Sequence, residues 1–398
     1  MGKNKSKMKV VIVGAGIAGL YAAYKLTADA AYAALPVSIT ILEKNSYPGG
    51  RALNTFFAGH SVPLGAGIGR WKKDKLLRKL LEDLEIPIRR FVAKTHYAFD
   101  EQPIDVIDTV RSLKAAKAAK ATGAPEAFGS FARKVLGPRD YKRFILTTGY
   151  TDDLKGDAEH TIKNYGHDDN AGDLDAFYVP WKELIDKLVA LLKSRGVRIK
   201  YNQEVNAVDA VKGVADAIIL ATPIDALMNL IPKNSAFSKV KSQPFIRVYA
   251  TFSKGGDLLR TVVPSATHVK GPLQKIIPMF PLAKRPMYMI AYADNDNAKL
   301  LKSPLEKEDR EYFSRKLEST LTLPKDSLEI TSMTGMYWPI GTHYFTKSQT
   351  KNTLSKLQKP TANVWVVGEA VAMHQGWVEG ALESVVSVEM DIKITLEK

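Results

Sequence analysis

The chain has 398 residues, no cysteine and a formal net charge of +15, with 45% hydrophobic and 25% charged residues. This length exceeds the roughly 250–300 residues that one hydrophobic core usually serves, so we expect two domains. The absence of cysteine excludes disulfides, cysteine-ligated zinc, iron–sulfur clusters and thiol catalysis. The positive charge favours contact with anionic surfaces, but no nucleic-acid-binding motif accompanies it, so we expect no specific nucleic-acid partner.

The first nine residues form a basic tail, and no long apolar segment follows them. Residues 1–6, MGKNKS, match the pattern for N-myristoylation, with a plain basic tail as the alternative. The apolar run Val10–Val13 is too short for a signal peptide, and no run reaches the roughly 18 residues of a membrane span. We therefore expect a cytoplasmic protein, or one in peripheral contact with a membrane.

The predicted elements begin with a strand at Val10–Val13, a helix over residues 20–34 and a strand over residues 37–42. This strand–helix–strand unit is typical of an open parallel sheet. Further helices are predicted over residues 72–84, 111–121, 181–194, 305–317 and 379–396. Further strands are predicted over residues 197–201, 214–220, 245–252, 275–280, 287–293 and 364–367. The β-rich runs after residue 243 indicate an antiparallel sheet, so the fold class is α/β with an inserted second domain.

A glycine-rich turn follows the first strand, in the sequence Gly14-Ala15-Gly16-Ile17-Ala18-Gly19. Gly14 permits a tight turn, Gly16 lets a pyrophosphate approach the backbone, and Gly19 lets the helix pack closely on the sheet. The N-terminus of the helix offers N–H groups to a phosphate. Glu43 ends the second strand, where it can accept a hydrogen bond from a ribose hydroxyl. Together these features predict a dinucleotide site rather than a merely structural turn.

Further motifs occur near both ends of the chain: Glu43-Lys44, Gly49-Gly50-Arg51, Leu64-Gly65-Ala66-Gly67-Ile68-Gly69-Arg70, Val366-Val367-Gly368-Glu369-Ala370 and Gln375-Gly376-Trp377-Val378-Glu379-Gly380-Ala381. With these motifs, the chain resembles the flavin-containing amine oxidase superfamily over most of its length. The superfamily includes monoamine and polyamine oxidases, L-amino-acid oxidases and related desaturases.

The resemblance implies a Rossmann-like FAD-binding domain and a discontinuous substrate domain of mostly antiparallel sheet plus helices. We expect residues 1–88, 195–243 and 355–398 to form the FAD-binding domain, and residues 89–194 and 244–354 the substrate domain. FAD is expected to bind noncovalently, and the absence of cysteine excludes a thioether link. No metal site is predicted.

The resemblance also implies which residues contact FAD. Arg51 would reach the pyrophosphate, Glu369 the ribityl or pyrophosphate region, and Val205, as a strand residue, the adenine. The loop from Gly65 to Gly69 would pack against the isoalloxazine ring, and the helix after Trp377 would direct its N–H groups to the flavin. The full predicted set is Gly14, Gly16, Ala18, Gly19, Glu43, Lys44, Gly50, Arg51, Gly65, Ala66, Gly67, Ile68, Val205, Ala221, Gly368, Glu369, Trp377, Val378 and Ala381. Ordinary turns, loops and sheet core are the alternatives at these positions.

On the substrate side, the resemblance implies two aromatic walls beside the flavin. Trp377 fits one wall, and His343 or Tyr344 fits the other, with a buried core aromatic as the alternative. The family usually has a lysine that holds a water near flavin N5, and Arg247 takes its place here. Arginine keeps its proton at useful pH values but can still orient a water, and Lys275 on a neighbouring strand is the alternative donor.

Two acidic pairs, Asp152-Asp153 and Asp168-Asp169, lie in a polar region before residue 178. Solvated loop acids are one interpretation, and binding of the distal ammonium of a diamine is the other.

The resemblance implies oxidation of a primary or secondary amine, with a small amine or amino acid and O2 as the expected partners. A hydride passes from the carbon beside the nitrogen to flavin N5, the imine is hydrolysed to an aldehyde, and O2 is reduced to H2O2. The alternatives are an L-amino-acid oxidase, a polyene or porphyrinogen desaturase, and a non-catalytic FAD-binding protein. Arg247 supports the amino-acid alternative because it can hold a carboxylate, and the non-catalytic alternative because it replaces the usual lysine.

Overall fold

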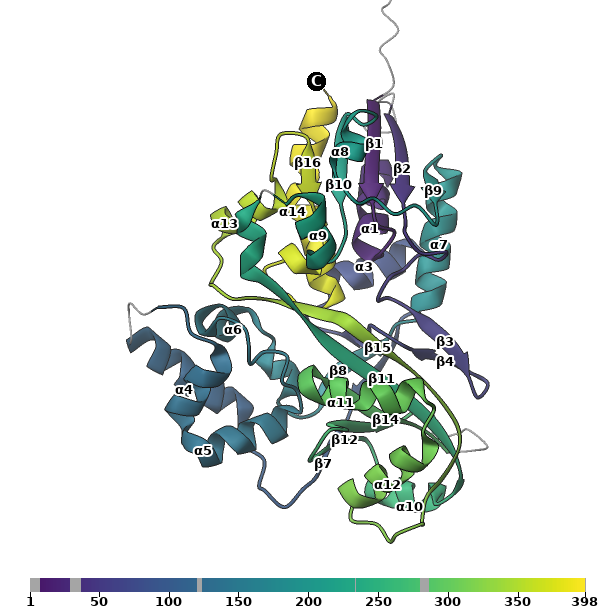
Figure 1. The fold of residues 1–398 in the computed structure, drawn as a ribbon, viewed down its shortest axis with the longest axis vertical. Helices are drawn as coiled ribbons and strands as arrows, with labels where there is room; N and C mark the ends of the chain where they lie inside the picture. The colour runs from purple at the N-terminus through teal and green to yellow at the C-terminus, as the bar shows by residue number, and fades with distance from the viewer. Residues whose placement is uncertain (1–7, 29–36, 120–123, 233, 280–285, 398) are drawn as a thin grey trace, which may run out of the picture.

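The computed structural model describes residues 8–28, 37–119, 124–232, 234–279 and 286–397. Residues 1–7, which carry the myristoylation pattern and most of the basic tail, lie outside the described residues. The chain forms two main parts, a parallel sheet with helices on both faces and a larger, mostly antiparallel sheet with a helical lobe beside it (Figure 1). Within the described residues, no helix has the length and apolar character of a membrane span.

The parallel sheet has the strand order β16-β10-β1-β2-β9. Its strands are β1 (Met8–Val13), β2 (Val37–Leu42), β9 (Arg198–Lys200), β10 (Ala217–Leu220) and β16 (Val364–Val366). The central strands are continuous apolar runs because side chains on both faces are buried. Val10 and Ile12 pack into one core, and Val11 and Val13 into the core on the opposite face.

Helices cover both faces of this sheet. One face is covered by α1 (Ile17–Ala28), α3 (Lys75–Asp83), α7 (Trp181–Ser194) and α14 (Val378–Leu396). The opposite face is covered by α8 (Asp209–Lys212), α9 (Ile224–Leu230) and α13 (Lys351–Gln358). The doubly covered parallel sheet is the Rossmann-like domain that the sequence predicts.

The second sheet has the strand order β15-β11-β14-β13-β12-β7, and it is antiparallel except for the β12–β7 pair. Its strands are β7 (Thr95–Ala98), β11 (Val240–Lys254), β12 (Ala266–Val269), β13 (Lys275–Pro278), β14 (Met287–Asp294) and β15 (Glu329–Phe345). The long strands β11 and β15 run from the Rossmann-like domain to the far end of the molecule (Figure 1). They therefore connect the two parts of the structure.

Helices α10 (Gly256–Val262), α11 (Asn295–Glu306) and α12 (Arg310–Thr320) pack with one face of the second sheet. The single helix expected over residues 305–317 is wrong, since the chain turns between α11 and α12. Asp309 begins the second helix by accepting a hydrogen bond from the backbone N–H of Tyr312. The opposite face of the sheet points toward the loops that enter from the Rossmann-like domain.

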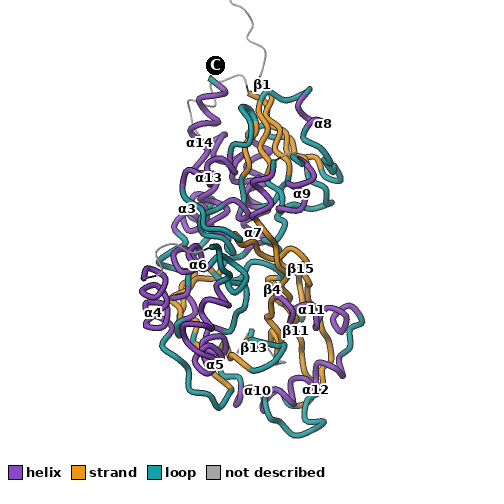
Figure 2. The backbone as a smooth tube through the Cα atoms, turned by 60° about the vertical axis from the view of Figure 1, so that its left-hand side comes forward, coloured by secondary structure: helices purple, strands orange, loops and turns teal. Residues whose placement is uncertain are grey.

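A helical lobe contains α4 (Val106–Ala119), α5 (Phe128–Thr148) and α6 (Ala158–Asn164), which share a small core of their own (Figure 2). The structure also contains smaller β-elements. These are the hairpin β3 (Asn54–Phe57) and β4 (His60–Pro63), and the sheet β5 (Gly69–Arg70), β8 (Leu174–Tyr178) and β6 (Arg89–Ala93).

The observed architecture confirms the predicted α/β class. The exact division of the chain into two domains stays a prediction. Helix α7 packs with α1 in the core of the parallel sheet, although it lies in the range expected for the substrate domain. Conversely, the β3–β4 hairpin packs against the second sheet.

Candidate active site

The β1–α1 turn has the backbone geometry that a dinucleotide requires. Gly14 has a φ of +104°, and a Cβ there would lie 2.6 Å from the carbonyl oxygen of Ala221. A Cβ on Gly19 would clash with the carbonyl oxygen of Gly14. At Gly16, by contrast, a Cβ would meet no heavy atom within 4 Å. Two glycines thus close the turn, and the third leaves an open space in front of the N-terminus of α1.

A second glycine turn lies against the first. The backbone N–H of Gly49 donates to the carbonyl of Ala15 at 2.8 Å, and the Cβ position of Gly50 is 3.5 Å from the Cα of Gly16. Glu43, buried at the end of β2, accepts hydrogen bonds from the N–H groups of Ala15 at 2.7 Å and Asn45 at 2.9 Å. The carboxylate is therefore held beside the open space at the turn.

Other predicted contacts lie around these turns. Ala221 follows β10 and donates its N–H to Val13 at 2.8 Å, whereas Lys44 is exposed beside Glu43. The interpretation of Val205 as a strand residue is wrong, because it lies in the segment between β9 and α8 and packs on the core there. Its proposed contact with adenine stays a prediction.

Arg51 and Glu369 form an ion pair between distant parts of the chain. Arg51 Nη1 lies 3.2 Å from Glu369 Oε2 and donates to the carbonyl of Gly341 at 2.5 Å. Glu369 also accepts from the N–H groups of His343 at 2.8 Å and Gly376 at 2.7 Å. Burial alone raises the pKa of this carboxyl, but His343 and Arg51 outweigh it and hold the pKa of Glu369 at about 2. The carboxylate therefore stays charged and fixes three chain segments.

The resemblance implies that His343 is an aromatic wall beside the flavin. In the structure, its ring instead forms part of this hydrogen-bond network. Its Nδ1 contacts Glu369, and its Nε2 accepts from the N–H of Ile224 at 3.2 Å. The side chain is buried, so the ring holds the Glu369 carboxylate in place. We assign His343 a positioning role.

The loop from Gly65 to Gly69 packs tightly against its surroundings. A Cβ on Gly65 would clash with the carbonyl of Arg51, and the N–H of Ala66 donates to that same oxygen at 2.8 Å. The carbonyl of Gly67 accepts from Trp181 Nε1 at 2.8 Å. Ile68 is 37% exposed. The loop is thus fixed from the side of the Rossmann-like domain.

Trp377 stands at the start of α14 and is held by its indole. Its Nε1 donates to Asp74 Oδ2 at 2.8 Å, and its ring meets that of Trp181 edge to face at 6.1 Å. Asp74 is fully buried and also accepts from the backbone and guanidinium of Arg70. Glu379, in the first turn of α14, accepts from backbone N–H groups at the start of α3. The helix start that carries Trp377, Val378 and Ala381 is therefore tied to α3.

Arg247 lies on β11, facing the glycine loop, and is 3% exposed. A Cβ on Gly67 would lie 2.8 Å from its Nη2. Its guanidinium lies over the ring of Tyr292, 4.3 Å from the centroid, because the register of β11 with β14 pairs these two residues. Phe245, two residues earlier on β11, also contacts Tyr292, at a ring distance of 6.2 Å.

Lys275 is not on a strand next to β11, since β14 separates β13 from β11. Its Nζ lies 3.4 Å from the ring centroid of Tyr150, and that ring meets Tyr292 edge to face at 5.5 Å. Burial lowers the pKa of Lys275 to about 7, although Asp152 and Asp294 oppose the shift.

The aromatic residues around Arg247 were missed in the sequence: Tyr150, Trp181, Phe245, Tyr292 and Trp338. The alternation of Phe245, Arg247 and Tyr249 along one strand was the available signal, since residues two apart share a face. Tyr150 and Tyr292 carried no such signal, because the register of distant strands places them.

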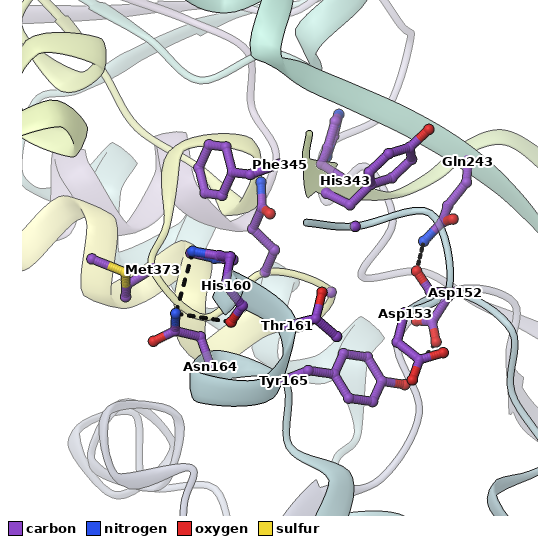
Figure 3. A pocket seen from close by; sticks show the side chains of 14 residues that line it. Asp152, Asp153, His160, Thr161, Asn164, Tyr165, Gln243, His343, Phe345 and Met373 are labelled. Atoms are coloured by element: carbon purple, nitrogen blue, oxygen red, sulfur yellow. Dashed lines mark hydrogen bonds between the residues drawn. The ribbon is translucent and has the colours of Figure 1, made fainter. Parts of the chain in front are cut away.

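The two acidic pairs have different surroundings. Asp168 pairs with Lys73, and Asp169 pairs with Arg70 at 2.8 Å. Asp152 is partly buried and lies near the start of β11. It accepts from Tyr165 at 2.7 Å, and its backbone carbonyl accepts from Gln243 at 2.5 Å (Figure 3). Burial and the neighbouring Asp294 raise the pKa of Asp152 to about 7.

Figure 3 shows the cavity that Asp152 lines together with Asp153, His160, His343 and Tyr344. Its volume is about 30 Å³, close to the share of one water molecule. Tyr344 thus lines this small cavity, whereas Trp377 contacts Trp181 and Asp74. The roles of Tyr344 and Asp152 toward a substrate stay predictions.

Fold and site together define a dinucleotide-binding α/β protein with a second, substrate-facing sheet. A family model described as an NAD(P)-binding Rossmann-like domain matches residues 12–84, and one described as flavin containing amine oxidoreductase matches residues 159–387. The second match spans more than half of the chain. The chain belongs to the flavin-containing amine oxidoreductase family.

Solved structures share the fold. A cyclohexylamine oxidase from Brevibacterium oxydans aligns with a TM-score of 0.75 at 14% identity, covering 98% of this chain and 100% of that one. A putrescine oxidase double mutant with redesigned cofactor binding aligns with a TM-score of 0.69 at 14% identity, covering 97% of this chain and 99% of that one. No curated protein matches the chain.

The family assignment makes the protein an FAD-dependent oxidoreductase that oxidises amines. The residues present fit this cofactor. The open space at Gly16, the N-terminus of α1 and the buried carboxylate of Glu43 suit the adenosine diphosphate half. The residues that would hold the flavin half are Arg51, Glu369 and the fixed loop at Gly65–Gly69.

Proposed function

We propose that the protein oxidises a small primary or secondary amine to an imine, with O2 as the electron acceptor and H2O2 as the product. Water then hydrolyses the imine to an aldehyde. Bound FAD supplies the redox chemistry, because its N5 accepts the hydride that leaves the carbon beside the nitrogen. The observation that carries the proposal is that Gly67 is contacted by Trp181 from the Rossmann-like side and by Arg247 from the second sheet.

The contribution of the chain is orientation and charge. Trp377 is locked by Asp74 and Trp181, so it can present a fixed aromatic wall without losing side-chain freedom on binding. The N–H groups at the start of α14 would face the flavin and stabilise the negative charge of the reduced ring, and Arg51 would hold the pyrophosphate. We infer that His343 and Glu369 hold these elements in register and do not touch the substrate.

Arg247 takes the position that the resemblance gives to a water-holding lysine. A buried guanidinium there can donate to a water through its fixed N–H fork, but it does not take up a proton from the substrate. The substrate ammonium must therefore lose its proton to solvent or to another group before oxidation.

The test is oxygen-dependent turnover by the purified holoprotein. It should be yellow, and it should release H2O2 with at least one member of a panel of monoamines, diamines and amino acids. Peroxide should form in a one-to-one ratio with the aldehyde or keto acid. A yellow protein that no member of the panel reduces, even without oxygen, would favour the non-catalytic alternative. Turnover of a polyene alone would favour a desaturase.

A further inference from the structure

Arg247 is a buried cation that has no carboxylate partner within ion-pair distance among the described residues. Its guanidinium lies near Gly67 and over the ring of Tyr292, and it interacts with the neutral side chains of Tyr249 and Tyr292, but its Nε has no hydrogen-bond partner among the described residues. The cation–π contact with Tyr292 stabilises the charge by far less than an ion of this size loses when it leaves water.

Other cations in the same region are compensated. Arg51 pairs with Glu369 at 3.2 Å, and Arg70 pairs with Asp74 at 2.7 Å. Lys275, which contacts the ring of Tyr150, has Asp152 and Asp294 close enough to stabilise its charged form. Buried charges are normally paired, so an uncompensated guanidinium in this region points to a missing anion.

The place of Arg247 restricts what the anion can be. The guanidinium touches the glycine loop that would pack on the flavin, so the anion must lie close to the reacting carbon. A guanidinium fork matches the two oxygens of a carboxylate. The same face of the sheet carries Phe245, whose ring lies 6.2 Å from that of Tyr292 and 6.4 Å from that of Trp338. These rings would suit an apolar or aromatic side chain.

We infer that Arg247 binds the carboxylate of the substrate, and that the preferred substrates are α-amino acids with an apolar or aromatic side chain. This inference rests on the proposed function and narrows it. The reaction then converts the amino acid and O2 into an imino acid and H2O2: the Cα–H and N–H bonds break, and O2 receives both electrons and both protons. Hydrolysis of the imino acid gives a 2-keto acid and ammonia.

Two compounds that differ only in the carboxylate give the direct test. Flavin reduction by phenylalanine and by 2-phenylethylamine is compared without oxygen, in the holoprotein and in Arg247→Gln. Arg260→Gln is the matched control, because Arg260 is half-exposed on α10 and pairs only weakly with Asp257, at 3.7 Å. The holoprotein should favour phenylalanine, and Arg247→Gln should reduce kcat/KM for phenylalanine about ten- to a hundredfold more than it reduces kcat/KM for 2-phenylethylamine.

A binding measurement covers the case in which Arg247→Gln does not fold. Benzoate should perturb the visible flavin spectrum of the holoprotein at concentrations at least tenfold lower than benzyl alcohol, which lacks the carboxylate. Preference for 2-phenylethylamine together with equal binding of the two probes would overturn the inference and leave amine oxidation intact. Failure of every amine and amino acid to reduce the flavin would instead overturn the proposed function.

Discussion

The glycine turns of the Rossmann-like domain and the Arg247 face of the second sheet build their sites in different ways. At the turns, backbone atoms define the site, and glycine is required where a side chain would meet Ala221 or Gly14. At Arg247, side chains from β11, β14 and the loop after α5 meet through strand register. A site made from one short segment is visible in the sequence, and a site made by register is not.

The first prediction, which has the largest expected effect, tests the glycine turns by placing a side chain at Gly16. The Cβ position there is open, so Gly16→Val should leave the fold intact but fill the space in front of α1. We expect the purified variant to be colourless, with a circular dichroism spectrum like that of the unmodified apoprotein. Gly213→Val is the matched control, because its Cβ position is also open but lies away from the turns. A yellow Gly16→Val protein would contradict the assignment of the cofactor site.

The second prediction concerns the support of Trp377. Asp74→Ala removes the acceptor that the indole N–H of Trp377 shares with the partly buried guanidinium of Arg70, which keeps Asp169 as its second partner. We expect the free energy of unfolding to fall by about 3–5 kcal/mol, as measured by denaturant unfolding. Asp257→Ala, at an exposed aspartate, should change it by less than about 0.5 kcal/mol. Equal effects of the two variants would show that Asp74 is not part of the support.

The same contrast between the two sites explains how much of the fold and of the candidate site could be predicted from the sequence. The Rossmann-like domain could be predicted from Gly14, Gly16, Gly19 and Glu43. The turn, helix and strand that these residues require are contiguous in the sequence. The positions of Tyr150 and Tyr292 could not be predicted, since they depend on which strands pair and in which register. The role of His343 was also hidden, because its partner Glu369 comes from another element.

The third prediction separates the charge of Glu369 from its shape. Glu369→Gln keeps the size of the side chain but weakens its contacts with Arg51, His343 and Gly376. We expect a loss of about 2 kcal/mol at pH 7. Because the folded-state pKa of about 2 lies below the ordinary value of 4.5, this stabilisation is complete above pH 4.5 and disappears as the pH falls toward 2.

Unfolding curves of Glu369→Gln and the unmodified protein should therefore converge in acid. The exposed Glu329→Gln serves as control and should show no such convergence. A constant difference between pH 7 and pH 3 would show that the charge of Glu369 is not what stabilises this junction.

Counted per pH unit, the smallest expected effect is at Lys275, and like the effect at Glu369 it raises stability as the pH rises, here in the alkaline range. Burial lowers its folded-state pKa to about 7 from the ordinary value of 10.5, so between these values the unfolded chain binds the proton and the folded chain does not. The penalty is complete below pH 7 and is relieved as the pH rises toward 10.5. The stability of the unmodified protein should rise relative to Lys275→Met over this interval, by about 1 kcal/mol per pH unit at most.

Thermal or urea unfolding at pH 7, 8 and 9 measures this difference. Lys325→Met, at an exposed lysine, is the control and should show no trend. A difference that stays constant from pH 7 to pH 9 would mean that nearby carboxylates, rather than burial, dominate the environment of Lys275.

The central claim is that this chain binds FAD and uses it to oxidise an amine. Anaerobic titration of the yellow holoprotein with a substrate from the panel, followed by admission of oxygen, tests it most directly. The account predicts that one equivalent of substrate bleaches one equivalent of flavin, and that oxygen restores the colour with release of one equivalent of H2O2. A protein that takes up no FAD on reconstitution, or whose bound flavin keeps its colour with every amine and amino acid tested, would contradict it.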